Sequence, residues 1–229
     1  MIIGIMGAMP DEVDQLCAKL EQVTKETYAG VEYHQGMLNG RQVVVCCAGM
    51  GKANAASTVQ VLITKYGAEK IIFSGIAGNL NTNLHINDVV LGGTLRYLDT
   101  DMRLVGQFKP GTADRPIEEY HSDDRLLELA DQALNDLNIH HIVGIIATGN
   151  YFVDDPQKVE QVIRETGADA VEMEGAAVAH VAARNDVPAL VIRALSDNAD
   201  TDYEDFKTFD ISEYADTAAK LTVNIAKRM

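Results

Sequence analysis

ADAVEMEGAAVAHVAARNDVPALVIRALSD, residues 168–197, is the stretch that decides the fold. It begins with a short apolar run, continues over 175–186 in a helical pattern rich in alanine and valine, and ends in the apolar run 188–197. Two strand-length apolar runs that enclose a helix are typical of a strand, helix, strand unit. Such strands are buried on both faces, so the stretch predicts a parallel sheet with helices packed against it.

The same alternation continues outward from this unit. Between residues 31 and 49, two strand-like runs are separated by Asn39-Gly40, a dipeptide that favours a type I′ hairpin turn and so predicts an antiparallel pair. No repeat or linker divides the chain, and residues 107–120 are expected to form a surface loop. The remaining runs predict strands over 1–7, 69–75, 86–98 and 140–150 and helices over 10–23, 55–67, 122–137, 155–166 and 212–229.

The fold class that follows is α/β. We expect a single three-layer α/β/α domain over residues 1–229, with a central mixed, mostly parallel sheet. The chain has 229 residues, which is enough for one such domain to bury a large core.

Composition and charge exclude several classes of protein. Hydrophobic residues make up 47% and charged residues 23% of the chain, as in ordinary globular proteins. No run approaches the roughly 20 apolar residues that cross a membrane, and the formal net charge of −15 repels nucleic acid phosphates. Residues 1–12 lack the basic flank of a signal peptide, so we expect a cytoplasmic protein without membrane or nucleic acid partners. The cysteines lack CxxC spacing and are expected to be buried thiols, namely Cys17, Cys46 and Cys47.

The familiar cofactor and metal motifs do not occur. Residues 48–55, AGMGKANA, lack the four-residue gap of the phosphate-binding motif GxxxxGK[ST], and no GxGxxG opens the first helix. The six histidines are scattered, and there is no HExxH motif or Cys/His cluster. We therefore expect neither a cofactor nor a metal ion.

Acidic residues gather where the predicted strands end. In open α/β sheets the ligand binds beyond the carboxyl ends of the strands, so these acids are candidates for chemistry. Glu12 lies in the first turn of the predicted helix 10–23, where an acid also suits the helix dipole. Asp197 ends the run 188–197, where a turn or a helix N-cap would equally use an aspartate. Taken singly, neither position distinguishes a catalytic acid from a structural one.

Glu172 and Glu174 lie on one face of the predicted strand 168–174 because side chains alternate along a strand. An acid in such an apolar run is costly unless it is paired or used in chemistry. Arg193 stands alone in the apolar run 188–197 and could pair with either acid. We assign Glu172 to that structural ion pair and Glu174, nearer the end of the strand, to the functional site.

The strand ends, taken together, carry a resemblance over essentially the whole chain. They are similar, in order and nearly in spacing, to the motifs of the 5′-methylthioadenosine/S-adenosylhomocysteine nucleosidase family, which has the nucleoside phosphorylase-like fold. The order and spacing of the set are far more specific than any one motif. The matching segments are GIMGAMPDEV at 4–13, AGMGKANAA at 48–56, GIAGN at 75–79, VEMEGAAVAH at 171–180 and RALSDNAD at 193–200.

The resemblance implies a hydrolase that releases adenine from 5′-methylthioadenosine and S-adenosylhomocysteine. Glu12 would position and deprotonate the attacking water, Glu174 would bind the ribose hydroxyls, and Asp197 would give a proton to N7 of adenine. Cleavage of a glycosidic bond needs an acid at the leaving group and a carboxylate that activates water on the other side of the sugar. Asp197 must then be kept uncharged, which burial favours, while the negative charge of Glu174 stabilises the cationic sugar.

The resemblance also implies how the base and the 5′ substituent are held. Phe152 would stack on adenine, with Tyr151 as the alternative, and the backbone of Val153 would read the edge of the base. Flexible methionines suit a pocket for 5′ groups of different size, although they could equally be core residues. The further residues expected to line the substrate are Met9, Met50, Ile76, Met173 and Ser196.

A homodimer is implied as well. In the family, an aromatic residue from the loop after Asp197 and residues of the second subunit close the 5′ pocket. The loop offers Tyr203, Phe206 and Phe209, and we do not choose between the two phenylalanines. The partner-facing residues are expected around Met102 and Val105.

Two positions depart from the family pattern. Ile76 stands where many members carry a small or hydroxylated residue, and Leu98 replaces an expected histidine. Neither residue is one of the three acids, but Ile76 changes the fit near Asp197.

Three other functions compete with this hypothesis. A purine nucleoside phosphorylase of the same fold would need cations for phosphate, but Arg41 lies at the hairpin tip and Lys52 starts a helix. A purine-binding protein without catalysis would not need all three acids. A nucleosidase that prefers another 5′-substituted adenosine, such as aminofutalosine or 5′-deoxyadenosine, stays open because the 5′ pocket is the part read worst from the sequence.

Overall fold

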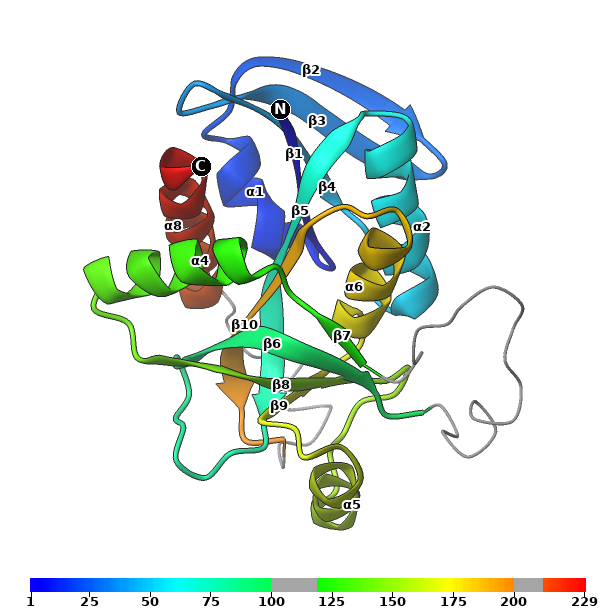
Figure 1. The fold of residues 1–229 in the computed structure, drawn as a ribbon, viewed down its shortest axis with the longest axis vertical. Coiled ribbons are helices and arrows are strands. Elements are labelled where there is room, and N and C mark those ends of the chain that lie inside the picture. Colours follow the sequence, from blue (N-terminus) through cyan, green and yellow to red (C-terminus); the bar gives the residue numbers. More distant parts are fainter. Residues whose placement is uncertain (100–118, 200–211) are drawn as a thin grey trace.

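The computed structural model describes residues 1–99, 119–199 and 212–229. The main chain alternates between strands and helices over most of this length (Figure 1). The strands are β1 (Ile2–Gly7), β2 (Glu21–Tyr28), β3 (Val31–Leu38), β4 (Arg41–Cys47), β5 (Ala68–Asn79), β6 (Val89–Tyr97), β7 (Glu119–His121), β8 (His141–Thr148), β9 (Ala170–Glu172) and β10 (Ala189–Asp197). The helices are α1 (Pro10–Cys17), α2 (Lys52–Thr64), α4 (Asp124–Asp136), α5 (Pro156–Thr166), α6 (Gly175–Arg184) and α8 (Ser212–Arg228).

The strands form one mixed sheet in the order β10-β6-β8-β9-β5-β1-β4-β3-β2, with β7 paired to β6. Strands β4, β1, β5 and β10 pair in parallel, and so do β6, β8 and β9. Antiparallel pairings of β10 with β6 and of β5 with β9 join these two sets, which therefore run in opposite directions. Because β10 also pairs with β5, the strands β5, β10, β6, β8 and β9 close into a ring.

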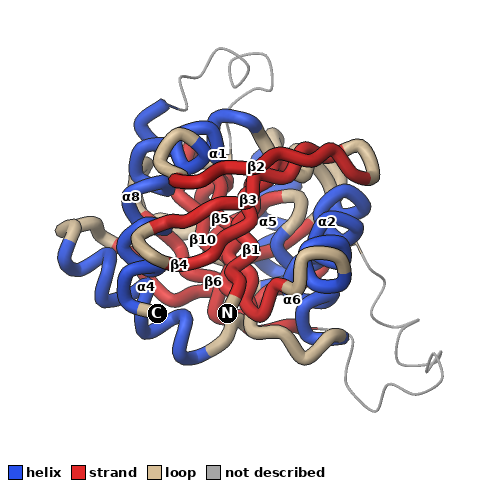
Figure 2. The backbone as a smooth tube through the Cα atoms, turned by 90° about the horizontal axis from the view of Figure 1, so that it is seen from above, coloured by secondary structure: helices blue, strands red, loops and turns tan. Residues whose placement is uncertain are grey.

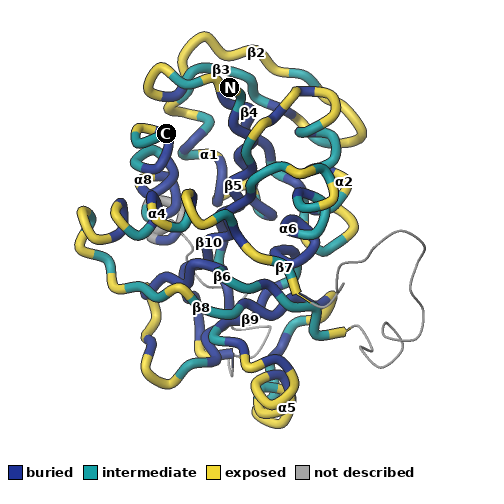
Figure 3. Tube along the Cα trace, in the orientation of Figure 1, coloured by how far each residue is buried: buried dark blue, intermediate teal, exposed yellow. Residues whose placement is uncertain are grey.

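Helices cover both faces of the sheet, as Figure 2 shows from above. On one face, α1, α4 and α8 pack their apolar residues onto one core cluster. On the other face, α2 and α6 pack against each other and onto a second cluster. The most deeply buried segments lie along the central strands between these layers (Figure 3). The predicted α/β domain, with a central mixed sheet between two helical layers, is confirmed.

The predicted hairpin is present between β3 and β4, which pair antiparallel. Asn39 and Gly40 have φ values of 51° and 79°. Positive φ at both central residues is what a type I′ turn requires, and asparagine and glycine adopt it at low cost.

The predicted helix 10–23 is wrong in its second half. Helix α1 ends at Cys17, and residues 21–28 form β2, the outermost strand of the sheet, which pairs with β3. Most of β2 is exposed, so it has no buried face whose alternation would reveal a strand, and its backbone pairing with β3 decides its structure. Strand β7 was missed as well, because it lies at the end of the predicted loop 107–120, whose other residues up to 118 lie outside the described chain.

Two smaller expectations have a mixed or limited outcome. All three cysteines are free, but only Cys46 is fully buried, while Cys17 and Cys47 are partly exposed. Within the described ranges, no helix is both long enough and apolar enough to cross a membrane.

Candidate active site

Glu12 is buried at the start of α1, with 5% of its surface exposed. Pro10 is the first residue of the helix, where the amides of the first turn and of the residues before it have no partner within the helix. The Glu12 carboxylate accepts hydrogen bonds at Oε2 from the amides of Ala8 (2.6 Å) and Met9 (3.0 Å), and at Oε1 from the amide of Ile76 (3.2 Å). Glu12 therefore caps the helix and also reaches across to β5.

Glu174 lies at the N-cap of α6, directly after β9. Its Oε1 accepts a hydrogen bond from the amide of Gly51 (2.6 Å), and its Oε2 lies 3.5 Å from Nη2 of Arg193. The expectation that Glu174 continues the strand of Glu172 is wrong, since β9 ends at Glu172 and the chain turns into the helix. Both acids nevertheless meet at Arg193.

The predicted ion pair between Arg193 and Glu172 is confirmed. Glu172 Oε2 also accepts hydrogen bonds from the amides of Glu174 (3.0 Å) and Gly175 (2.7 Å), and its Oε1 accepts one from the hydroxyl of Thr148. Thr148 Oγ1 in turn accepts the amide of Ala176 (2.8 Å). Glu172 is thus fully engaged in holding the start of α6, which agrees with a structural role.

Arg193 sits among more negative charge than it can neutralise. Its side chain is 1% exposed, and its guanidinium lies 4.1 Å from the ring centre of Phe73. Burial raises the pKa of Glu12, and the charge of Arg193 offsets this only in part. Burial, followed by the charge of Glu172, raises the pKa of Glu174 to about 7. One guanidinium compensates one carboxylate, so the others retain protons more readily than in water.

Gly75 lets this cluster approach β5. A Cβ added to Gly75 would overlap Nη1 of Arg193 and lie 2.7 Å from Oε1 of Glu12. Glycine is therefore required there, and any side chain would displace Arg193 or Glu12.

Asp197 ends β10 with 6% of its surface exposed. Its Oδ1 accepts a hydrogen bond from the amide of Ala199 (2.7 Å), and its Oδ2 lies 2.6 Å from Oγ of Ser196, which also lies 3.2 Å from the carbonyl oxygen of Ala77. The bond to the amide two residues on is the turn interaction that an aspartate in this position makes. Ala199 has a φ of 56°, a left-handed conformation that alanine adopts at a cost.

The two ends of the site lie along one strand. In the register of β5 and β10, Arg193 pairs with Gly75 and Asp197 pairs with Gly78. Glu12 contacts β5 at Ile76, two residues before Gly78, so both acids meet the same end of this strand.

Comparison with known proteins identifies the family. A family model described as the phosphorylase superfamily matches residues 2–229. A curated 5′-methylthioadenosine/S-adenosylhomocysteine nucleosidase of Bacillus cereus (strain G9842) is 40% identical over 202 residues, which are 87% of each chain. The chain belongs to the phosphorylase superfamily, in its 5′-methylthioadenosine/S-adenosylhomocysteine nucleosidase family.

Solved structures of this family and of a related hydrolase have the same fold. The S-adenosylhomocysteine nucleosidase of Streptococcus pyogenes, in complex with 5-methylthiotubericidin, superposes with a TM-score of 0.92 at 32% identity, over 100% of this chain and 97% of that one. The futalosine hydrolase of Helicobacter pylori strain 26695 superposes with a TM-score of 0.90 at 31% identity, over 100% of this chain and 98% of that one. The nucleoside phosphorylase-like fold expected from the sequence is therefore confirmed.

The other residues predicted for a nucleosidase site range from exposed to buried, and Met9, Ile76 and Ser196 contact the acids directly. Tyr151 is 43% exposed, whereas Phe152 is half-buried and Val153 is buried. Met50 is 61% exposed in the turn before α2. Met9, Ile76 and Met173 are half-buried, and Ser196 is buried beside Asp197. The predicted residues Phe206 and Phe209 lie outside the described chain, as do Tyr203, Met102 and Val105.

Sequence reasoning missed the backbone groups that hold the three acids. The amides of Ala8, Met9 and Ile76 bind Glu12, the amide of Gly51 binds Glu174, and the amide of Ala199 binds Asp197. Any non-proline residue can supply a backbone amide, so the residue type does not reveal these donors. The position of each segment at a strand end was the available signal. The departure Leu98 packs against Gly149, where a Cβ would lie 2.8 Å from Leu98 Cγ.

Proposed function

We propose that this protein hydrolyses the N-glycosidic bond of 5′-methylthioadenosine and S-adenosylhomocysteine. The products are adenine and the corresponding thioribose, and the reaction serves methionine salvage and the recycling of S-adenosylmethionine. The observation that carries the proposal is that two buried acids from different elements meet the same strand, β5: Glu12 of α1 at Ile76 and Asp197 of β10 at Gly78.

Glu12 is the base in this proposal. It accepts hydrogen bonds from three backbone amides, which fix the carboxylate, and burial raises its pKa, which makes the carboxylate a stronger base. The water, held against Glu12, adds its oxygen to C1′ of the ribose as its proton passes to the carboxylate. Glu174, fixed by the amide of Gly51, binds the ribose hydroxyls and places negative charge near the cationic sugar.

Asp197 is the acid. Its Oδ1 is held by the amide of Ala199, and its Oδ2 faces the hydroxyl of Ser196. The proton of the aspartic acid moves to N7 of adenine as the bond from the base to C1′ breaks, so adenine leaves uncharged. Phe152 stacks on the base, and its half-burial suits this role better than the exposed side chain of Tyr151.

The arrangement favours water over phosphate as the nucleophile. Near Glu12, in the described part of the chain, the neighbouring cation is Arg193, and two carboxylates already bind it. A phosphate there would meet Glu12, Glu172 and Glu174, whose charges repel it.

The test is an assay of four nucleosides with and without phosphate. The protein is incubated with 5′-methylthioadenosine, S-adenosylhomocysteine, adenosine and inosine, and the free base is followed by chromatography. Release of adenine from the two thionucleosides without phosphate supports the proposal. Strict dependence on phosphate would mean a phosphorylase, and no turnover of any nucleoside would mean a binding protein.

A second candidate is a nucleosidase for another 5′-substituted adenosine. The similarity to a futalosine hydrolase over the whole chain favours it specifically. Adding aminofutalosine to the same assay decides between the two, because the preferred substrate has the higher kcat/KM.

Three further expectations stay predictions: one domain over residues 1–229, a homodimer and a cytoplasmic location. Light scattering on the purified protein measures the mass and so tests the dimer.

A further inference from the structure

Three residues from separate elements form a closed set of contacts, which we call the clamp: Lys52, Asp99 and Asn150. Lys52 is the first residue of α2, Asp99 follows β6, and Asn150 follows β8. Lys52 Nζ lies 2.5 Å from each carboxylate oxygen of Asp99. The backbone amide of Asn150 donates to Asp99 Oδ2 (3.2 Å), and the backbone amide of Lys52 donates to the side-chain oxygen Oδ1 of Asn150 (3.1 Å).

The clamp lies at the surface, where Asp99 and Asn150 are exposed residues, but the two side chains of its ion pair are partly covered. The side chains of Lys52 and Asp99 are only 22% and 24% exposed, and Lys52 Nζ also lies 5.4 Å from the ring centre of Tyr97. Exposed pairs contribute little because solvent screens them and their long side chains lose freedom. Each member of the clamp instead has two partners, so the geometry of one fixes the others.

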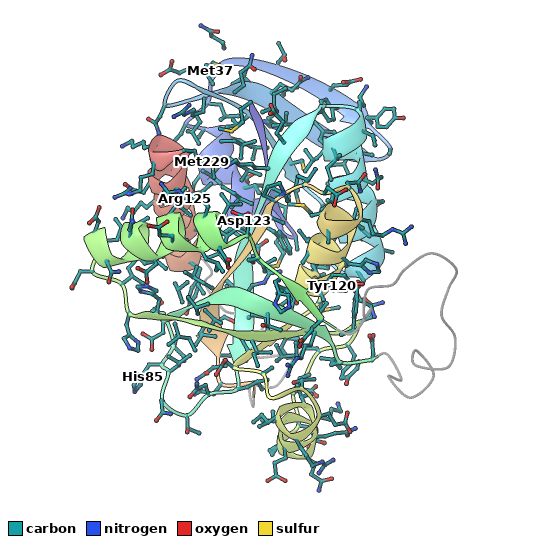
Figure 4. All side chains as sticks on the ribbon, viewed as in Figure 1. Met37, His85, Tyr120, Asp123, Arg125 and Met229 are labelled. Atoms are coloured by element: carbon teal, nitrogen blue, oxygen red, sulfur yellow. The ribbon has the colours of Figure 1, made fainter. Side chains whose placement is uncertain are left out.

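Tyr97, whose ring contacts the cation of Lys52, is itself held in place. The hydroxyl of Tyr97 lies 3.2 Å from Nδ1 of His180, and the ring of Tyr120 stacks on His180 with centres 4.4 Å apart. Figure 4 labels Tyr120 on β7 beside α6. The aromatic rings therefore join β6, β7 and α6 beneath the cation of Lys52.

The clamp connects the two turns that carry opposite halves of the site. Directly before Lys52, the amide of Gly51 binds Glu174, the proposed ribose acid. Directly after Asn150 come the residues Tyr151, Phe152 and Val153, of which the last two are proposed to hold the base.

Both turns also have backbone features of their own. Gly51 has a φ of +96°, a conformation that favours glycine, and a Cβ there would make an ordinary van der Waals contact, at 3.5 Å, with Oδ1 of Asn150. The amide of Gly149 donates to the carbonyl oxygen of Glu172 (3.0 Å). The turn after β8 is also fixed at its other end by Val153, which is buried. The clamp therefore acts on the distance between this turn and the turn that contains Gly51.

We propose that Lys52, Asp99 and Asn150 are positioning residues that fix the distance between the ribose and base subsites. The proposal rests on the proposed nucleosidase function. A ligand that spans both subsites depends on that distance, whereas adenine alone occupies one subsite and does not. The clamp therefore contributes to binding of the whole nucleoside without taking part in proton transfer.

The test compares Lys52→Met, Asp99→Asn and the double variant with the wild type. We expect KM for 5′-methylthioadenosine to rise roughly tenfold, as for a displaced binding group, while kcat falls less than about threefold. The Kd of adenine, measured by calorimetry, stays within about twofold because one subsite is intact. The double variant should have the same KM as Lys52→Met, because either substitution alone already breaks the ion pair between Lys52 and Asp99.

Lys65→Met is the matched control. Lys65 caps the far end of the same helix and pairs with Glu26 at 2.8 Å, so the substitution also removes a lysine ion pair but leaves the site alone. Its KM should equal that of the wild type. Lys52→Arg keeps the cation and should recover most of the lost affinity.

Other outcomes overturn the clamp. An unchanged KM in Asp99→Asn rejects it, and so do additive effects in the double variant. Equal losses of adenine and nucleoside affinity with a lower Tm would leave only a structural role. Turnover of 5′-methylthioadenosine by the wild type is measured first, and a wild type that fails to cleave it rejects the proposed function. An active wild type whose variants have an unchanged KM rejects the clamp alone.

Discussion

At the proposed ribose end of the site, Glu12, Glu172 and Glu174 gather around Arg193, whereas at the proposed base end Asp197 is bound by the hydroxyl of Ser196 and the amide of Ala199. The first end carries the cost of crowded buried charge. The second carries the cost of a left-handed alanine, because Ala199 has a φ of 56°. One strand, β5, connects the two ends.

In the proposed mechanism the two ends have different tasks. The carboxylates around Arg193 place negative charge where the sugar becomes positive. Asp197 gives a proton to the base, and Ala199 and Ser196 fix the positions of its two oxygens. We therefore expect a change at Glu174 to alter the pH dependence of stability and a change at Asp197 to act on the rate.

Asp197→Asn should have the largest effect. Asparagine keeps the size of the side chain but has no proton to give, so we expect kcat to fall by about 10³–10⁴ with an unchanged Tm. Kinetics with 5′-methylthioadenosine and thermal melting measure the two. The matched control is Asp155→Asn, because Asp155 Oδ1 also accepts the amide two residues on (Gln157, 2.7 Å) but lies at the start of α5. A rate near that of the wild type in Asp197→Asn would remove the acid from the mechanism.

Glu12→Gln should follow, with kcat lowered by about 10²–10³ because the base is lost. The variant should be as stable as the wild type or more so, since the substitution takes one negative charge from a crowded cluster. Urea unfolding measures the stability, and the same kinetic assay measures the rate. Retained activity would mean that another group activates water.

The alternation of apolar runs was enough to predict the layers and most of the elements. It failed at β2, because an exposed edge strand has no buried face, and at Glu174, because β9 stops two residues earlier than the apolar run suggests. The acids were found from their strand-end positions and from the family resemblance. Their partners were not, because backbone amides such as those of Gly51 and Ala199 have no sequence signature.

The opposite directions of the two strand sets were also hidden from the sequence. The usual rule for open sheets places all site residues at one edge. Here β9 runs antiparallel to β5, while β10 runs parallel to it on the other side, so Glu174 and Arg193 meet although their strands run in opposite directions. Closure of the ring of strands depends on pairing between β10 and β5, which no local pattern records.

Glu174→Gln should change the pH dependence of stability. Burial raises the pKa of Glu174 from 4.5 to about 7, so the folded protein holds this proton more tightly than the unfolded chain does. The stability from this group is fully present below pH 4.5 and is lost as the pH rises through about 7. The wild type should therefore lose up to about 3 kcal/mol relative to Glu174→Gln between pH 4.5 and pH 8.

Urea unfolding of both proteins across this range measures that difference. The control is Glu26→Gln, because the hydrogen bond from Lys65 lowers the pKa of Glu26 and gives its contribution the opposite sign. If the free energies of unfolding of the wild type and Glu174→Gln had the same pH dependence, ionisation of Glu174 would not destabilise the folded protein.

Ala199→Gly should have the smallest effect and tests the base end. Glycine adopts a positive φ without strain, which stabilises the fold, but it frees the unfolded chain and removes a buried methyl group. These terms nearly cancel, so we expect the free energy of unfolding to change by less than about 1 kcal/mol in either direction. The amide that binds Asp197 is retained, so kcat should stay within about threefold of the wild type. A large loss of kcat without a loss of stability would mean that the methyl group of Ala199, and not only its amide, sets the direction of the acid.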